Sequence, residues 1–274
     1  MAYHVRIKPS SGFRGINLRE LWGFRGLLAA LAIRDIKLRY RQTALGVAWV
    51  ILQPLLASGV LAFVFGTIAR VTRPERSSVF VFVLGGFIGW TLFSTTFMRA
   101  SQSLLQHSML ISKVFFPRLV LPVSAVASGL LDTAIGLTFF FVLRLFSGSP
   151  FGLEIMTLPI WLAMLLMIAL GLGLVSAALS VRFRDVQYIT PVFIQLLLYA
   201  SPVAYQTAAV PERWRVFFSL NPLVSLFEGL RWSLLGEGDV SLSAVLYILF
   251  TSLLVPGLGL LLFKRAEREF ADLI

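Results

Sequence analysis

Disulfide-forming residues and metal ligands are scarce in this sequence. It contains no cysteine, which excludes disulfide bonds and metal sites built on cysteine. The two histidines, His4 and His107, stand far apart along the chain. We therefore expect no histidine-based metal site.

The sequence also lacks the short motifs that mark nucleotide-binding and hydrolytic enzymes. It contains no G-x-x-x-x-G-K-[ST] phosphate loop, no G-x-S-x-G nucleophile elbow and no H-E-x-x-H zinc motif. Asp35, Asp132 and Asp185 are scattered, which disfavours a membrane-embedded enzyme such as a lipid glycosyltransferase. We expect this chain to bind no cofactor, so that any ATP is bound by a separate subunit.

Charged residues are few. Only 14% of the residues are charged and 58% are hydrophobic, whereas soluble domains are about 25% charged. The net charge of +11, in a chain this apolar, favours anionic lipid headgroups over nucleic acid as the partner. The first 20 residues contain no apolar core with a cleavage site, so we expect no secretory signal peptide.

Long apolar runs dominate the rest of the chain, and about 20 such residues cross a bilayer. Lys and Arg gather in the loops on the N-terminal side, which places both termini in the cytoplasm. The sequence predicts an all-α membrane protein with a cytoplasmic N-terminal part (1–46), a six-span domain (47–263) and a cytoplasmic tail (264–274). The predicted spans are about 47–69, 79–97, 119–146, 158–181, 188–205 and 243–263.

Small residues and caps add detail to two of these regions. In the fourth span, Gly171 and Gly173 allow close helix approach. The outer region 206–242 is too apolar for a solvated loop, and its stretch NPLVSLFEGLRWSLLG begins with Asn221 and Pro222, a good N-cap and first-turn pair. This stretch ends in a glycine and is too short for a full span, so it predicts an interfacial or re-entrant helix.

A cationic stripe precedes the first span. Between residues 27 and 41, helical spacing places Arg34, Lys37 and Arg41 on one stripe, beside an apolar stripe that includes Ile33. Such a helix lies in the cytoplasmic interface, with its cations at headgroup level. It is either a general membrane anchor or a guide that leads an anionic lipid headgroup toward the following span.

Four motifs resemble those of a known family. RDIKLRYRQTALGVAWVILQPLL (34–56), LISKVFFPRLVLPVSAVASGLLD (110–132), VRFRDV (181–186) and NPLVSLFEGLRWSLLG (221–236) occur in matching order. Together they resemble the ABC-2 type permeases that export lipid-linked polysaccharide, namely O-antigen, capsule or teichoic acid. The resemblance covers nearly the whole chain but does not specify the glycan.

This resemblance implies an assembly of a permease homodimer with two copies of a cytoplasmic ATPase, which holds ATP and magnesium. The loop 99–118 would form a coupling helix that docks on the ATPase, with the turn 182–185 as a second contact. The alternatives are a loop packed on its own spans and a local Arg–Asp pair that caps the span. The predicted docking residues are Leu104, Leu105, Met109, Ile111, Lys113, Arg182, Arg184 and Asp185.

Aromatic side chains are the candidates for glycan contact, because their ring faces cover the C–H surfaces of sugars. The alternative for any one of them is a place in the core or against lipid. The resemblance also suggests that the outer helix is a gate near the channel exit. The alternative is an interfacial helix, in which Glu228 and Arg231 could form an ion pair. The candidates for the channel are Trp90, Phe93, Phe139, Phe140, Tyr199 and Tyr205, and those for the gate are Asn221, Pro222, Phe227, Glu228, Arg231 and Trp232.

We therefore expect a transport subunit of a bacterial cytoplasmic membrane, and not an enzyme. Its expected cargo is a polysaccharide on an undecaprenyl-diphosphate-type lipid, such as O-antigen; membrane lipids are further partners and nucleic acid is not. The alternative is an ABC-2 permease for teichoic acid, capsule, or a small lipid or drug. The residues expected to meet the diphosphate are Arg34, Lys37, Arg39, Arg41 and Arg118.

Overall fold

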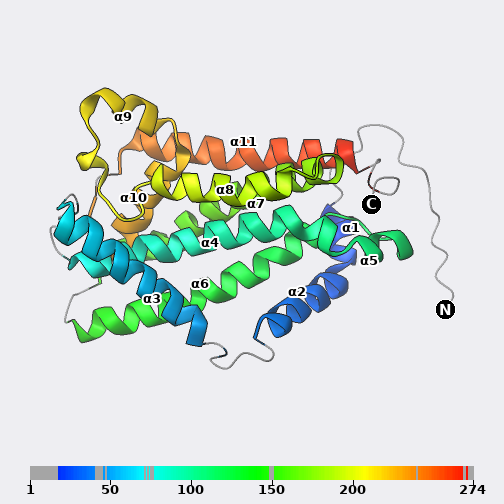
Figure 1. Ribbon diagram of the computed structural model, residues 1–274, viewed down its shortest axis with the longest axis horizontal. Helices are drawn as coiled ribbons and strands as arrows, with labels where there is room; N and C mark the ends of the chain where they lie inside the picture. Colours follow the sequence, from blue (N-terminus) through cyan, green and yellow to red (C-terminus); the bar gives the residue numbers. More distant parts are fainter. Residues whose placement is uncertain are drawn as a thin grey trace.

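A computed structural model gives the fold of this chain (Figure 1). It describes residues 18–40, 46, 48–70, 72, 74, 77–147, 151–238, 240–267 and 270. Within these ranges every regular element is a helix, and several of the long helices run side by side, with others inclined to them (Figure 1). The elements are α1 (Leu18–Gly23), α2 (Arg25–Tyr40), α3 (Ala48–Ala62), η1 (Phe63–Ile68), α4 (Val79–Gln106), α5 (Ser108–Lys113), α6 (Val120–Phe146), η2 (Leu153–Thr157), α7 (Leu158–Arg182), α8 (Val186–Tyr199), η3 (Thr207–Ala209), α9 (Glu212–Ser219), α10 (Pro222–Leu235) and α11 (Leu242–Ala266).

Five described helical segments are long and apolar enough to cross a membrane. They are α3 continued by the π-helical η1, then α4, α6, α7 with the preceding η2, and α11. They match the first, second, third, fourth and sixth predicted spans, although α4 continues nine residues beyond the predicted end, to Gln106. The membrane-spanning, all-helical class expected from composition is confirmed.

The fifth predicted span is shorter than expected. α8 has 14 residues and ends at Tyr199, so it is about 21 Å long, whereas the hydrocarbon core is about 30 Å thick. Pro202 follows closely, and a proline disfavours helical backbone at the residue before it and donates no N–H. The chain turns at Ala200 and does not continue as a helix to Tyr205. The count of six full-length spans is therefore not confirmed.

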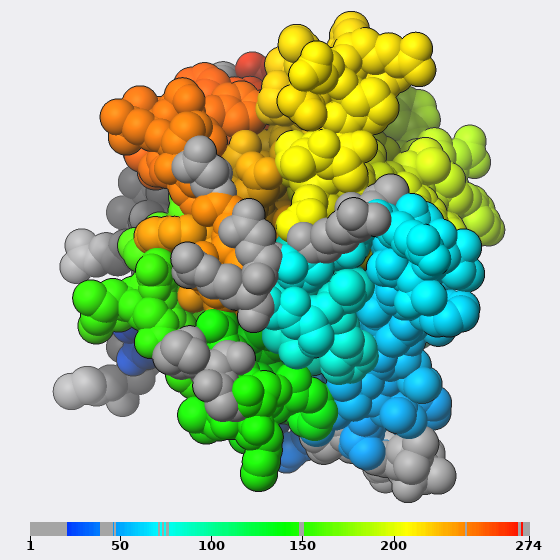
Figure 2. Space-filling view, turned by 90° about the vertical axis from the view of Figure 1, so that its left-hand side faces the viewer, coloured from blue at the N-terminus to red at the C-terminus, as the bar shows by residue number. Residues whose placement is uncertain are grey.

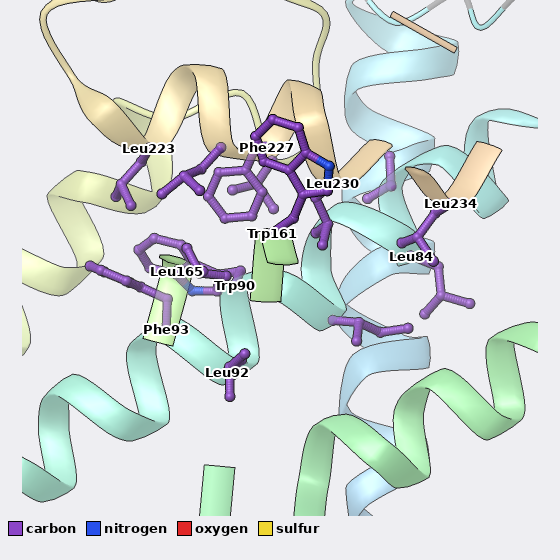
Figure 3. Packing of buried hydrophobic residues seen from close by; sticks show 14 of the residues in the cluster. Leu84, Trp90, Leu92, Phe93, Trp161, Leu165, Leu223, Phe227, Leu230 and Leu234 are labelled. Atoms are coloured by element: carbon purple, nitrogen blue, oxygen red, sulfur yellow. The ribbon is translucent and has the colours of Figure 1, made fainter. Parts of the chain in front are cut away.

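α4 lies at the centre of the bundle, in contact with α3, α6, α7, α8 and α10. The larger buried cluster of the described residues joins α4 to α7 and α10. Figure 3 shows Trp90 and Phe93 of α4 beside Trp161 of α7 and Phe227 of α10. Lipid tails are as apolar as these side chains, so packing and not escape from water holds the helices together in a bilayer.

Glycines allow α7 to approach its neighbours closely. A Cβ atom on Gly171 would lie 2.6 Å from the backbone nitrogen of Pro256 in α11, and one on Gly173 would lie 2.5 Å from the Cβ of Ala100 in α4. Real Cβ atoms do not come this near to other heavy atoms. The predicted close approach at both glycines is confirmed.

The two ends of the bundle differ in their elements. We call the end that carries α1, α5, the α7–α8 turn and the last turn of α11 the α5 end (Figure 1). We call the opposite end, with η1, η2, α9 and α10, the α10 end; Figure 2 faces it, with α9 standing out in yellow. A second, smaller buried cluster lies at the α5 end and contains Leu31, Leu104, Phe116, Leu174 and Phe263. The α5 end is the one predicted to face the cytoplasm.

Candidate functional site

The predicted coupling loop consists of a helix end, a corner and a short separate helix. Residues 99–106 continue α4, and α5 follows the corner at His107. α4 is longer than predicted because Leu104 is fully buried in the smaller cluster. This burial stabilises the helix as far as Leu104. The expected short helix before Pro117 exists, with bounds Ser108–Lys113.

The predicted docking residues on this segment divide into two groups. Leu104 and Ile111 are buried and hold α5 against the bundle, and Leu105 is half-buried. Met109 is 77% exposed and Lys113 is also exposed. Phe115, which the sequence did not single out, is 73% exposed just beyond α5. The tip of the α5 end therefore presents apolar surface beside a positive charge.

The α7–α8 turn is a second exposed feature at the α5 end. Arg182, Arg184 and Asp185 are all exposed there. The Arg182 guanidinium lies over the Phe183 ring, 5.6 Å from its centroid, and the Asp185 carbonyl accepts the N–H of Tyr188 at 2.9 Å as α8 begins. The turn thus combines two cations, one carboxylate and an aromatic ring on the surface.

The cationic stripe lies on α2, whose bounds agree with the predicted amphipathic helix. Lys37 and the apolar Ile33 are exposed. Arg34 is exposed as well, but its guanidinium donates to Asp35 and to His107. The side chain of Arg39 and the whole of Arg41 lie outside the described residues.

Arg118, the fifth candidate for the headgroup, joins two helices. Its guanidinium donates to the backbone carbonyl of Glu267, directly after α11. It also lies over the ring of Phe270, with 5.7 Å between the guanidinium carbon and the ring centroid. Arg118 therefore connects the start of α6 to the end of α11.

The candidate channel aromatics do not share one surface. Trp90, Phe93 and Phe140 are buried inside the chain, and the Trp90 and Phe93 ring centroids are 5.4 Å apart. These three are core side chains in this conformation. Phe139 is half-buried and Tyr199 is exposed.

Tyr205, the last channel candidate, braces the turn after α8. It is half-buried, and its hydroxyl donates to the carbonyl of Tyr199 at 2.8 Å. Burial raises the pKa of Tyr205 to about 12, although the nearby charge of Arg231 opposes the rise. The phenol therefore stays protonated, and remains a donor, at neutral pH.

The predicted outer helix has the expected caps and is largely buried in the bundle. The Asn221 side-chain oxygen accepts the Leu223 N–H at 3.0 Å, and Gly236 ends the helix with a φ of 67°. Leu226, Phe227 and most of their neighbours on α10 are buried, while Trp232 and Pro222 are half-buried. The helix therefore packs against α4, α7 and α11 at the α10 end of the bundle.

Arg231 of this helix binds backbone, and the expected pair with Glu228 is replaced. It is only 4% exposed. Its guanidinium donates to the carbonyls of Pro202 and Tyr205 and lies 4.1 Å from the centroid of the Phe82 ring. The half-buried Glu228 lies near enough for its negative charge to act on this guanidinium. Arg231 thus ties α10 to the turn after α8.

A second buried arginine holds the other end of α10. Arg144 of α6 donates to the carbonyl of Leu234 and lies over Phe151, with 5.1 Å to the ring centroid. Cations bind favourably near the C-terminus of a helix, where carbonyls lack partners. Arg144 and Arg231 thus hold the two ends of α10. In the sequence, each could have been found as an arginine that interrupts an apolar run.

Two exposed aromatic residues on α9 were not among the candidates. Trp214 and Phe217 are both more than half exposed, and their ring centroids are 6.1 Å apart. Their signal in the sequence is the pair of aromatic residues in a short, charged segment next to a proline. Figure 2 shows α9 projecting from the α10 end.

The part of the chain that the structure describes contains no group of three His, Cys, Asp or Glu side chains able to hold a metal ion. The long apolar helices define the class of this chain: a membrane protein with several spans.

Comparison with known proteins identifies the family. Residues 26–235 match the ABC-2 type transporter family, and the chain belongs to it. It is 33% identical to the O-antigen export system permease protein RfbA of Myxococcus xanthus over 211 residues, which cover 76% of this chain and 80% of the relative. It is 27% identical to the polysialic acid transport protein KpsM of Escherichia coli over 244 residues, covering 87% and 92%. It is also 26% identical to a Klebsiella pneumoniae RfbA over 253 residues, covering 90% and 95%.

Proposed function

We propose that two copies of this chain, with two copies of a separate cytoplasmic ATPase, export a lipid-linked polysaccharide across the bacterial cytoplasmic membrane. The relatives named for O-antigen and polysialic acid transport support the cargo class. The chain supplies the path, and the ATPase supplies the energy. Both termini and the α5 end face the cytoplasm in this proposal.

The exposed tip of the α5 end carries the proposal. Met109 and Phe115 expose large apolar surfaces beside Lys113, and Leu104 and Ile111 anchor the segment from below. Exposed apolar patches next to charge mark contact sites for other proteins. The α7–α8 turn offers further charged groups at the same end (Figure 1). A cytoplasmic ATPase is the occupant that we assign to this surface.

The cationic helix α2 is the proposed entry for the lipid headgroup. Lys37 is exposed beside the apolar Ile33, the arrangement that holds cations at headgroup level with apolar side chains in the acyl region. Each cation near an anionic membrane surface contributes about 1 kcal/mol to attraction. A diphosphate would be guided along this helix toward α3, with Arg39, Arg41 and Arg118 as further candidates.

Deletion of the gene for this chain tests the cargo. We expect lipid-linked polysaccharide to accumulate on the cytoplasmic side, and surface polysaccharide to return when the wild-type chain is supplied. The measurement is the amount of surface polysaccharide against the intracellular lipid-linked pool. A deletion strain with an undisturbed surface glycan would overturn the proposal and leave a small lipid or drug as the cargo to test.

A further inference from the structure

His107 lies where two helices meet and faces a third. Its backbone N–H donates to the carbonyl of Leu104 at 3.3 Å, which ends α4. Its own carbonyl accepts the N–H groups of Leu110 and Ile111 at 2.9 and 3.0 Å, which begins α5. The residue is only 8% exposed, and its imidazole contacts α2.

The hydrogen bonds of this imidazole define its tautomer. Nδ1 lies 2.8 Å from the backbone carbonyl oxygen of Ser103, which can only accept, so Nδ1 carries the proton. Nε2 of the neutral ring is then an acceptor, and Nη2 of Arg34 donates to it. The same Nη2 also donates to Asp35, whose Oδ1 lies 2.9 Å from Nη2 and 3.2 Å from Nε. A continuous path of polar contacts therefore joins the last turn of α4 to α2.

Apolar packing supports the same junction. Leu31 of α2, Leu104 of α4 and Ile111 of α5 belong to one buried cluster. α2 also packs along α6. The polar path and the cluster together connect α2 to the α4–α5 corner, and His107 is the polar link between them.

We propose that His107 is a positioning residue for transport, tying the cationic helix α2 to the corner from which α5 extends. Neutral imidazole suits this place because it accepts a hydrogen bond from an arginine without adding a second positive charge. The consequence rests on the proposed function: displacement of α5 by a docked ATPase would move α2, and with it the bound headgroup. Reciprocally, a headgroup on α2 would bias the position of α5.

A distance measurement between α2 and α5 tests whether His107 links α2 to the α4–α5 corner, and it does not depend on transport. The chain contains no cysteine, so L38C and M109C place spin labels only at two positions that are well exposed. Electron paramagnetic resonance on the full chain in lipid nanodiscs, with the labelled chain diluted in unlabelled chain, should give one narrow distance distribution within a single copy. H107L should broaden or shift it. H107Q should restore it, because the amide can donate to Ser103 and accept from Arg34.

An unchanged distribution in H107L would overturn the proposal. An H107Q distribution as broad as that of H107L would also overturn it, because the hydrogen bonds that glutamine can make would then not be what fixes the distance between α2 and α5. R34Q breaks the same contact from the other side, and R34Q/H107L should be no worse than either single variant. If H107L does not accumulate, the R34Q variant alone tests the link between α2 and the α4–α5 corner. An unchanged distance in R34Q would then overturn the proposal.

Export in cells gives the second readout. H107L should lower surface polysaccharide at least tenfold at normal abundance and normal ATPase capture, and H107Q should retain most of it. Q106L is the matched control, because the exposed neighbour Gln106 bonds only to Gln102 on its own helix, at 3.1 Å. Full export in H107L would contradict the coupling role. If the wild-type chain exports no glycan, the proposed function fails, while the spin-label distances still decide the tie.

Discussion

The buried arginines around α10 and the exposed arginines of the α7–α8 turn, at opposite ends of the bundle, are used in opposite ways. At the α10 end, Arg144 and Arg231 are buried and donate to backbone carbonyls of their own chain. At the α5 end, Arg182 and Arg184 are exposed on a turn. A buried arginine is costly unless its donors are used within the protein, and an exposed one is available to another molecule. The arginines around α10 are therefore used by contacts within the chain, while those of the α7–α8 turn are accessible on the surface.

The packing of apolar side chains shows the same contrast. The helix at the α10 end is buried around Phe227 and Leu230, whereas the helix at the α5 end leaves Met109 largely exposed. The variants described next should affect stability when they change the α10 end or the packing of the bundle, and should affect binding of the ATPase when they change the α5 end.

Removing Arg231 should have the largest effect on stability. R231M leaves the carbonyls of Pro202 and Tyr205 without their donor inside the bundle, which costs about 3 kcal/mol. Thermal unfolding of the purified chain measures the loss. R213M is the control, because Arg213 is exposed on α9, and it should leave the unfolding temperature unchanged. Equal stability of R231M and wild type would show that the α10 end does not depend on this arginine.

Filling a close contact between two helices should have the next largest effect. G171A places a methyl group against the backbone of Pro256, which cannot rotate away, and should cost about 2 kcal/mol. In the control G257A the new Cβ meets no atom within 4 Å, so stability should be kept. The pair is compared by the unfolding temperature in the same detergent. A G171A chain as stable as G257A would contradict the described approach of α7 and α11.

A charge on the α5 tip should weaken docking and leave the fold intact. M109D should reduce co-purification of the ATPase about tenfold, equivalent to about 1.4 kcal/mol. M156D is a closely matched control, since Met156 is 76% exposed against 77% for Met109 but lies at the α10 end. Equal capture of the ATPase by both variants would remove Met109 from the docking surface.

The smallest expected effect is that of Y205F. Losing the hydroxyl donated to the Tyr199 carbonyl should cost about 1 kcal/mol. Because the pKa of Tyr205 is raised to about 12, its contribution should be constant below about pH 10, the ordinary tyrosine value. It should decline between pH 10 and 12, where the unfolded chain ionises first. Stability curves of wild type and Y205F against pH check this, and a difference that varies near neutral pH would contradict it.

Features set by local sequence were predictable. The bounds of α10 followed from Asn221, Pro222 and Gly236, which act through neighbouring backbone. The five long spans followed from length and composition. The early end of α8 was missed because the apolar pattern continues past Pro202, and the pattern outweighed the proline.

Features set by distant contacts were not predictable. Trp90 and Leu104 were assigned to a channel and a docking surface, yet both are buried, and no local pattern tells a buried apolar side chain from one that faces a partner. Arg231 and His107 depend on partners 29 and 73 residues away. Single-sequence periodicity carries no information about such pairs.

Reconstitution tests the central claim most directly, namely that this chain is the passive path of an ATP-driven glycan exporter. The purified chain and the ATPase would be placed together in proteoliposomes with lipid-linked polysaccharide on the side of the α5 end, and glycan appearing on the other side would be measured. We predict movement only when both subunits and ATP are present, with no ATP hydrolysis by this chain alone. Glycan movement without the ATPase, or none with the complete system, would contradict the claim.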